Sequence, residues 1–226
     1  MENNQTDHLE ALGRHALRYA RPGNVIGLGT GRAATAFINA LGASLIQVRG
    51  VPTSRASEEL GRSLGIEVVS LADAPRIDID FDGADEVDPR LNLIKGYGGA
   101  LVREKIVAAS SRKFIVLVGE EKLVKRLGSR GNLPVEVIPF GAPLAMRRIS
   151  ALGLKPRVRE KDGAAFVSDN GNYILDCGVK EIRNPARLER DLLAIPGVVG
   201  TGLFLGMASM VLVARADGRI DVLRSR

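Results

Sequence analysis

The sequence contains no tryptophan, and aromatic residues make up only 4% of the chain. Proteins that bind single-stranded nucleic acid stack bases on aromatic side chains, so this scarcity argues against that function. The single cysteine, Cys177, excludes a disulfide within the chain. Acidic residues occur at Glu2, Asp7 and Glu10 before any apolar stretch, so we expect no secretory signal. These absences favour a cytosolic (cytoplasmic) protein that binds no nucleic acid.

Only one long segment lacks charge, residues 192–214, which is long enough to span a bilayer. It contains Pro196 and four glycines and divides into short strand-like pieces, so we expect no membrane association. The chain has 226 residues, 45% hydrophobic and 26% charged, which is typical of a globular protein with a substantial core. The net charge of +6 favours anionic partners. The basic run at residues 147–161 is expected to be a solvated surface.

Strand-like apolar runs alternate with helical patterns through the first half of the chain. We expect strands at residues 24–28, 45–51, 67–71, 77–81 and 114–118, and helices at residues 33–41, 54–64 and 99–109. This alternation predicts an α/β protein with an open, doubly wound parallel sheet, a Rossmann-like fold. Ligands of such sheets bind at the carboxyl ends of the strands.

The pattern changes after the segment at residues 128–134. We expect strands at residues 135–139, 166–168, 172–176 and 197–205, helices at residues 142–152 and 185–193, and a hairpin turn at Asp169-Asn170-Gly171. This β-α-β-β-α-β order predicts an inserted ferredoxin-like α+β domain, and strands at 210–214 and 220–223 could return the chain to the first sheet. The expected domains are residues 1–130 plus 206–226, Rossmann-like, and residues 131–205, ferredoxin-like.

A glycine-rich turn, Gly27-Leu-Gly-Thr-Gly-Arg-Ala-Ala34, follows the first predicted strand and opens a helix. Glycines allow a tight turn, and the N–H groups at a helix start can bind an anion. The turn could also be purely structural. Its spacing fits a dinucleotide fingerprint, but the acid required after the next strand is replaced by Pro52-Thr-Ser-Arg55. This replacement argues against a nicotinamide cofactor.

Six acidic residues lie within residues 78–88. Strand alternation would point Asp78, Asp80 and Asp82 to one side, and Gly83 would let Asp85 turn back. Oxygen ligands of this kind could hold Mg²⁺ or Ca²⁺, or the segment could be a solvated acidic turn.

In residues 93–105 a second glycine-rich turn runs into a helix, with Lys95 just before the turn and Glu104 in the first turns of the helix. An acid at this place could simply pair with the helix dipole.

Taken together, these segments resemble type A ribose-5-phosphate isomerases. The match includes GLGTG at 27–31, TS at 53–54, DGADEVD at 82–88 and LNLIKGYGGALVREKIVA at 91–108, and it continues through LPVEVIPFG at 133–141, DNGNYILD at 169–176 and IPGVVGTGLF at 195–204. The resemblance implies interconversion of ribose 5-phosphate and ribulose 5-phosphate in the pentose phosphate pathway. It also implies a Rossmann-like domain with an inserted ferredoxin-like domain, a homodimer or tetramer, and no metal or other cofactor.

The resemblance also implies roles for single residues. Glu104 matches the catalytic base, and Asp82, Asp85 and Lys95 match catalytic residues around the sugar. The residues expected to bind substrate are Thr30, Gly31, Arg32, Ala33, Asp82, Gly83, Ala84, Asp85, Lys95, Gly96, Tyr97, Gly98 and Lys122. One carboxylate could move the proton between C2 and C1 through an enediolate, whose negative charge Lys95 would stabilise.

Several positions depart from the family's pattern. Arg32 and Ala33 stand where members commonly have Ser and Thr, Tyr97 interrupts the glycine run, and Leu9 occupies the place of an N-terminal lysine. Because a guanidinium can bind two phosphate oxygens at once, Arg32 is expected to contact the 5-phosphate in place of the missing hydroxyls. The alternative is that Arg32 simply points to solvent at the start of the helix.

The main alternative is a sugar-phosphate-sensing domain without catalysis. Such regulators need a DNA-binding module, and roughly 20 residues before Gly23 are too few for a helix-turn-helix domain. Retention of Glu104 and Lys95 also favours an enzyme.

Overall fold

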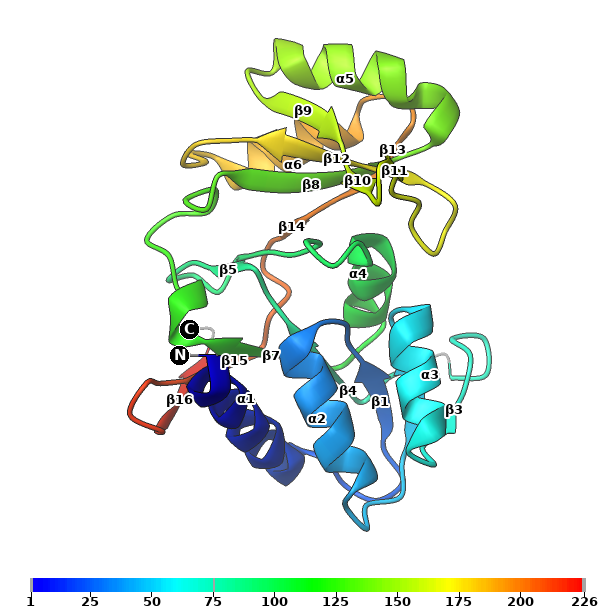
Figure 1. Cartoon of the computed structure of the whole chain (residues 1–226), viewed down its shortest axis with the longest axis vertical. Coiled ribbons are helices and arrows are strands. Elements are labelled where there is room, and N and C mark those ends of the chain that lie inside the picture. Colours follow the sequence, from blue (N-terminus) through cyan, green and yellow to red (C-terminus); the bar gives the residue numbers. More distant parts are fainter. Residues whose placement is uncertain (1, 75, 225–226) are drawn as a thin grey trace. The chain divides into compact units, whose positions relative to one another are not determined.

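The computed structural model describes residues 2–74 and 76–224 (Figure 1). By its internal packing the chain divides into two compact units. The first unit comprises Met1–Ala84, Arg103–Leu123 and Met207–Arg226, and the second comprises Asp85–Val102 and Val124–Gly206. The domain boundaries expected at residues 130/131 and 205/206 stay a prediction, because compact packing does not say which part folds independently.

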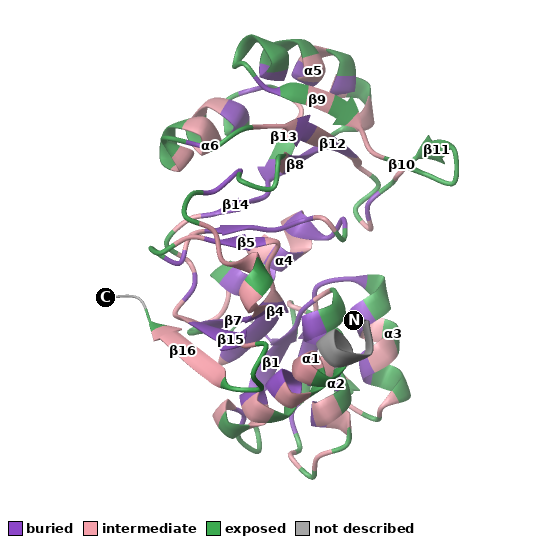
Figure 2. Ribbon diagram, turned by 60° about the vertical axis from the view of Figure 1, so that its left-hand side comes forward, coloured by how far each residue is buried: buried purple, intermediate pink, exposed green. Residues whose placement is uncertain are grey.

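A seven-stranded sheet forms the centre of the first unit, in the order β16-β15-β7-β4-β1-β2-β3. Every pairing is parallel except that of β16 with β15. The strands are β1 (Val25–Leu28), β2 (Arg49–Pro52), β3 (Glu67–Val68), β4 (Ile79–Gly83), β7 (Phe114–Gly119), β15 (Met210–Ala214) and β16 (Ile220–Arg224). The doubly wound sheet and the return of the C-terminal strands to it are therefore confirmed. Figure 2 shows that the central strands are buried while β16 is only half-buried.

Helices cover both faces of this sheet. On one face lie α1 (Glu2–Ala16), which was not among the predicted elements and is followed by the 3-10 helix η1 (Leu17–Tyr19), α2 (Arg32–Gly42) and α3 (Arg55–Ser63). On the other face, α4 (Leu101–Ala109) packs Val107 against Val25 and Val51. Because side chains alternate along a strand, Ile26 and Leu28 of β1 point to the first face and Val25 to the second.

Side-chain packing explains the position of α2 and the start of β2 in the first unit. Phe37 of α2 stacks on Phe81 of β4, with ring centroids 4.1 Å apart, which fixes α2 on the sheet. The strand predicted at residues 45–51 begins only at Arg49. Leu45 is 95% exposed, so the apolar run that predicted a longer strand includes a surface residue.

The second unit contains a four-stranded antiparallel sheet in the order β13-β8-β12-β9. Its elements are β8 (Asn132–Val137), η3 (Pro139–Gly141), α5 (Ala142–Ala151), β9 (Lys155–Val158), β12 (Tyr173–Gly178), α6 (Pro185–Leu193) and β13 (Val198–Thr201). Their succession is the predicted β-α-β-β-α-β order of a ferredoxin-like unit. Both helices pack on one face of the sheet, where Ile149 of α5 and Leu192 of α6 share a core with Val135.

Cys177 of β12 belongs to this core and is fully buried. Burial, with a smaller effect from the charge of Asp176, raises the pKa of its thiol to about 12. The thiol is therefore protonated at neutral pH.

The prediction for the middle of this unit was partly wrong. The turn at residues 168–171 forms, with the Gly171 N–H donating to the Ser168 carbonyl at 2.8 Å, but only Val167 bridges to Tyr173. The second strand of the ferredoxin order is β9, and residues 160–165 form the small hairpin of β10 (Glu160–Lys161) and β11 (Ala164–Ala165). The strand β9 reads Lys-Pro-Arg-Val and lies at the sheet edge, where proline and charge are tolerated, so it lacks an apolar signature.

A three-stranded antiparallel sheet also belongs to the second unit. It consists of β5 (Glu86–Val87), β6 (Leu93–Ile94) and β14 (Leu203–Phe204), in the order β14-β6-β5. The uncharged segment 192–214 is thus divided between β13, β14 and β15. In the described part of the chain, no helix is both long enough and apolar enough to cross a membrane.

Candidate active site

Four neighbouring parallel strands of the first unit, β7, β4, β1 and β2, end at the same edge of the sheet. The chain passes from β1 to β2 and β3 on one side and then enters β4 on the other, so the strand order reverses between β1 and β4. Open α/β sheets bind ligands outside the carboxyl ends of the strands at such a point. Residues 30–33 follow β1, residues 82–84 end β4, and Lys122 ends the short helix η2 (Glu120–Lys122) after β7. The fold therefore brings these predicted residues to one edge.

Asp82 is fully buried at the end of β4. Its Oδ1 accepts the backbone N–H of Thr30 at 3.0 Å and that of Gly83 at 2.7 Å. The close approach requires glycine at position 29, where a Cβ would lie 2.4 Å from Asp82 Oδ1 and 2.5 Å from the Phe81 carbonyl oxygen. Two backbone donors therefore fix the orientation of this carboxylate.

Asp80 and Asp82 point to the same face of the sheet, as alternation predicted. Their neighbour Phe81 lies in the core under α2. Asp80 lies on the side of α4, since a Cβ at Gly27 would be 2.3 Å from Asp80 Oδ1 and 2.7 Å from Val107. The acids of β4 thus lie on the face that α4 covers.

Glu104 lies in the first turn of α4 and is 3% exposed. Residues three apart share one face of a helix, so Glu104 lies on the same side as Val107, which contacts the sheet. The helix between two parallel strands must run back along the sheet, so Glu104 lies one turn nearer the carboxyl edge than Val107. This position places a buried carboxylate on the face that carries Asp80 and Asp82.

The start of α2 offers positive charge at the same edge. Gly31, the N-cap residue, has a φ of 101°, a conformation that favours glycine. Arg32 follows as the first helical residue and is exposed, whereas Ala33 is buried. The first N–H groups of a helix lack intrahelical partners and attract anions. Leu9, by contrast, packs against the core of the first unit, so this chain has no cation at that position.

The hydroxyl of Thr30 belongs to a cluster that sequence reasoning did not include in the site. Thr30 Oγ1 lies 2.7 Å from Thr53 Oγ1 and donates to Ser54 Oγ at 2.8 Å. Thr53 is fully buried, and Ser54 caps α3 in a capping box with Ser57. The loop after β1 is therefore tied to the loop after β2. The Thr-Ser pair directly after β2 is the sequence signal that could have found this cluster.

In the second unit, Asp85 and Lys95 flank the paired strands β5 and β6. The Asp85 N–H donates to the Ile94 carbonyl at 2.8 Å, and the Lys95 N–H donates to the Gly202 carbonyl at 2.9 Å. Lys95 is only 2% exposed, and its Nζ lies 5.6 Å from the centre of the Phe204 ring. A buried ammonium is costly unless compensated, and the face of an aromatic ring supplies part of that compensation.

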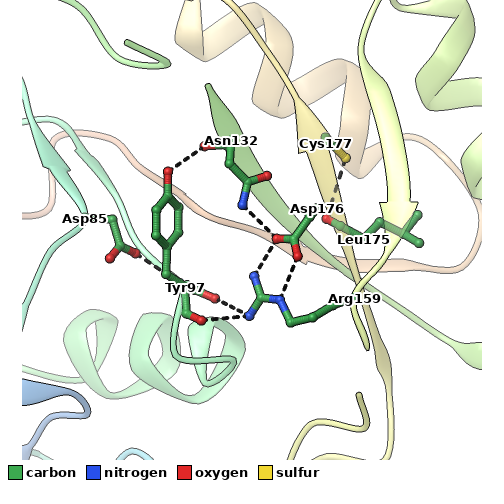
Figure 3. A network of polar contacts seen from close by, with 8 residues as sticks. Asp85, Tyr97, Asn132, Arg159, Leu175, Asp176 and Cys177 are labelled. Atoms are coloured by element: carbon green, nitrogen blue, oxygen red, sulfur yellow. Dashed lines mark hydrogen bonds and ion pairs between the residues drawn. The ribbon is translucent and has the colours of Figure 1, made fainter. Parts of the chain in front are cut away.

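The loop at residues 96–98 follows Lys95. Gly96 adopts a φ of 105° and Gly99 a φ of 88°, so both positions favour glycine. The Tyr97 N–H donates to Asp85 Oδ2 at 3.0 Å (Figure 3). Burial, together with the charges of Asp85 and Glu86, raises the pKa of Tyr97 to about 12, so its hydroxyl remains protonated at neutral pH. The tyrosine that interrupts the glycine run thus holds the Asp85 carboxylate through its backbone.

Sequence reasoning missed the side chains whose hydrogen bonds and ion pair fix this loop, Arg159 and Asp176. Arg159 donates to the carbonyls of Gly96 and Tyr97 and pairs with Asp176 (Figure 3). The basic run at 147–161 was expected to be solvated, but the Arg159 side chain is only 13% exposed. Asp176 ends one of the matched segments, which is the signal that could have singled it out.

The acidic side chains at residues 82–88 accept hydrogen bonds from different parts of the chain. Glu86 is fully buried and accepts the N–H groups of Gly128 and Arg130 at 2.6 Å each. Asp88 accepts the Asn92 N–H at 2.9 Å within its own turn. Within residues 2–74 and 76–224, no three His, Cys, Asp or Glu side chains are grouped so that they could hold a metal ion.

Known proteins resemble this chain over nearly its whole length. The sequence pattern of ribose 5-phosphate isomerase A (phosphoriboisomerase A) matches residues 49–218. Ribose-5-phosphate isomerase A from Roseiflexus sp. (strain RS-1) is 50% identical over 92% of this chain and 92% of its own.

Two solved structures agree with this match. Ribose 5-phosphate isomerase A from Methanocaldococcus jannaschii superposes with a TM-score of 0.91 at 39% identity, covering 96% of this chain and 98% of that one. A D-ribose-5-phosphate isomerase in complex with phospho-erythronic acid superposes with a TM-score of 0.93 at 38% identity and the same coverage. The chain belongs to the ribose 5-phosphate isomerase A family.

Proposed function

We propose that this chain interconverts ribose 5-phosphate and ribulose 5-phosphate, with Glu104 as the base that moves the proton between C2 and C1. The observation that carries the proposal is the 50% identity to a ribose-5-phosphate isomerase A across 92% of both chains. The relative that binds phospho-erythronic acid supports the substrate class. The carboxylate of that sugar acid resembles the paired oxygens of an enediolate.

The proton transfer requires one carboxylate that works in both directions. Glu104, buried in α4, removes the C2 proton of the open-chain aldose, and the electrons move to form an enediolate. The same carboxyl then returns the proton to C1, which produces the ketose. Burial of Glu104 keeps the abstracted proton from exchanging freely with bulk water.

The other polar residues handle the charge and the hydroxyl protons. The ammonium of Lys95 stabilises the developing negative charge on the enediolate oxygen, an electrostatic effect that is strong where water is excluded. Asp82 and Asp85 move protons between O1 and O2 and assist opening of the furanose ring. Each of these carboxylates accepts a backbone N–H that fixes its orientation, from Thr30 for Asp82 and from Tyr97 for Asp85.

We assign the 5-phosphate to the start of α2. The helix N-terminus attracts an anion, and exposed Arg32 adds a charge that can bind two phosphate oxygens. Gly31, Ala33 and Thr30 form the surrounding loop. Lys122, Gly83, Ala84, Gly96 and Gly98 complete the substrate contacts that the family resemblance implies.

Replacing Arg32 by alanine should weaken phosphate binding. We expect KM to rise by roughly tenfold while kcat falls much less, because the contact is the same in the ground state and the transition state. Steady-state kinetics with ribose 5-phosphate measure both constants. Arg55, which likewise begins a helix after a parallel strand, provides the matched control as Arg55→Ala. An unchanged KM in the Arg32 variant would leave Lys122 or backbone N–H groups as the phosphate anchor.

Exhaustive treatment with EDTA should leave the isomerase rate unchanged. A carboxylate base and a neighbouring ammonium are sufficient for an enediolate route, so the chemistry does not require a Lewis acid. The rate is measured before and after chelation, and again after adding Mg²⁺ or Mn²⁺. Loss of activity that either ion restores would show that acids at residues 80–88 are metal ligands.

The activity itself is tested by following ribulose 5-phosphate formation from ribose 5-phosphate with the purified chain. Binding of ribose 5-phosphate without turnover would favour a sensor over an enzyme.

We further propose that the chain acts in the cytosol as a homodimer, or as a tetramer built from such dimers. The exposed apolar residues Ile138 and Phe140 of the second unit support association, because apolar side chains at a free surface favour contacts with another chain.

A further inference from the structure

Arg159 contacts the loop at residues 96–98, which directly follows Lys95. All three nitrogen atoms of its guanidinium group donate hydrogen bonds. Its Nη1 donates to the carbonyl of Gly96 at 2.9 Å and to that of Tyr97 at 3.0 Å. Its Nε and Nη2 donate to the two oxygens of Asp176 at 2.9 and 2.5 Å (Figure 3). The single side chain therefore bridges strand β12 and two consecutive carbonyls of the loop.

The carboxylate of Asp176 is itself fixed in place. Asn132 of β8 donates to its Oδ1 at 2.8 Å. Burial raises the pKa of Asp176, but the hydrogen bonds from Arg159 and Asn132 and the Arg159 charge outweigh it and lower that pKa. Asp176 is therefore ionised at neutral pH and presents two acceptors to the guanidinium fork.

The loop is otherwise built from conformations that need support. Gly96 and Gly99 both adopt positive φ angles, and glycine has more freedom to leave such conformations than other residues. The ring of Phe166 packs against Gly99, and a Cβ added to Gly99 would lie 2.5 Å from that ring. The Arg159 guanidinium lies 5.9 Å from the centre of the same ring. Without Arg159, the carbonyls of Gly96 and Tyr97 would lose their hydrogen bonds to the guanidinium.

We infer that Arg159 and Asp176 are positioning residues for the isomerase reaction, which act by holding the loop at residues 96–97 and thereby the ammonium of Lys95. This inference rests on the charge-stabilising role proposed for Lys95. Neither side chain needs to touch substrate. The pair fixes the backbone that directly follows Lys95, whose own N–H is held on the other side by Gly202.

The test uses Arg159→Lys, which keeps the charge but loses the planar fork that serves a carboxylate and two carbonyls at once. Because small displacements of a catalytic group are costly, we expect kcat to fall by about tenfold or more while KM stays within about twofold. Asp176→Asn, which keeps the shape, should lower kcat in the same way but less. The matched control is Arg126→Lys, whose exposed ion pair with Glu181 lies in the same unit, and it should leave both constants unchanged.

A double-mutant cycle separates positioning from general stability. In a Lys95→Met background, Arg159→Lys and Asp176→Asn should cost less than about twofold further in kcat, because their effect passes through the missing ammonium. Melting temperatures are measured for every variant, and rates are compared well below the lowest of them. Should Arg159→Lys fail to fold, Asp176→Asn carries the cycle.

The positioning role would be overturned by an unchanged kcat in the folded Arg159 and Asp176 variants. It would also be overturned if their fold-losses in kcat were the same in the Lys95→Met background as in the wild type. Neither result would affect the isomerase activity proposed above. Wild-type kcat in the Lys95→Met variant would overturn the role proposed for Lys95, and the positioning role with it.

Discussion

Glutamine at position 104 should abolish isomerisation while leaving the fold intact. Glutamine has the shape of glutamate, so the 3% exposed site in α4 can accommodate it, but its amide cannot take a proton from C2. Removing a general base typically costs at least about 10²-fold, and this reaction uses the same group twice. The assay of ribulose 5-phosphate formation measures kcat, and calorimetric titration with ribose 5-phosphate measures binding, which should persist.

The control for this variant is Glu58→Gln, the same substitution at a partly exposed helical position of the first unit. It should keep wild-type rates. If Glu104→Gln retained activity within a few-fold of wild type, another group would be the base, and Asp82 would be the first to examine. Transfer of deuterium from C2 of labelled ribose 5-phosphate to C1 of the product provides a second measurement, since it depends on the base but not on exchange with bulk water.

Replacing Gly29 by alanine should reduce both stability and activity strongly. The new Cβ would meet the Asp82 carboxylate at 2.4 Å and the Phe81 carbonyl at 2.5 Å, and that carbonyl also accepts the Gly29 N–H. The Phe81 carbonyl is backbone, and the N–H groups of Thr30 and Gly83 hold the Asp82 carboxylate, so β1 and β4 must separate or the carboxylate must turn away. Overpacking of this kind costs about 1–3 kcal/mol in the free energy of unfolding. Because Asp82 is displaced, we expect kcat/KM to fall by about 10²-fold.

Gly83→Ala provides the steric control in the melting experiment. At that position a Cβ would lie 3.7 Å from its nearest neighbour, the Leu117 carbonyl oxygen, which is ordinary contact. The melting temperature should therefore fall for Gly29→Ala and not for Gly83→Ala. Equal melting temperatures of the Gly29 variant and the wild type would mean that the strands shift apart without cost, contrary to this account.

Much of the first unit could be predicted because its signals are local. Buried parallel strands read as short apolar runs, and the glycines at 27–31 mark the turn from β1 into α2. Alternation along β4 correctly placed Asp80 and Asp82 on one face. In the second unit, the helix expected at residues 185–193 is α6 at the same bounds, with Asn184 as its N-cap and Pro185 at its first position.

What could not be predicted depends on partners far apart in the chain. The edge strand β9 carries charge and proline because only one side of it is paired, so periodicity does not reveal it. Arg159 lies among surface cations in sequence, and only the fold shows that it meets Gly96, 63 residues away. Thr53 and Ser54 could be noted as a matching pair, but their contact with Thr30 exists only once β1 and β2 lie side by side. The resemblance identified residue types, and the structure adds what supports them.

The buried thiol of Cys177 makes the chain its own reporter of local unfolding. Alkylating reagents attack exposed thiolates, and this sulfur is both covered by the ferredoxin-like core and protonated, with a pKa of about 12. Labelling must therefore wait for β12 to leave the sheet, and its rate follows the population of that opened state. Since the sequence holds no other cysteine, mass spectrometry of a single adduct reports the opening of β12 specifically. A ligand that stabilises the second unit would therefore lower the alkylation rate of Cys177, and no engineered probe is needed to measure this.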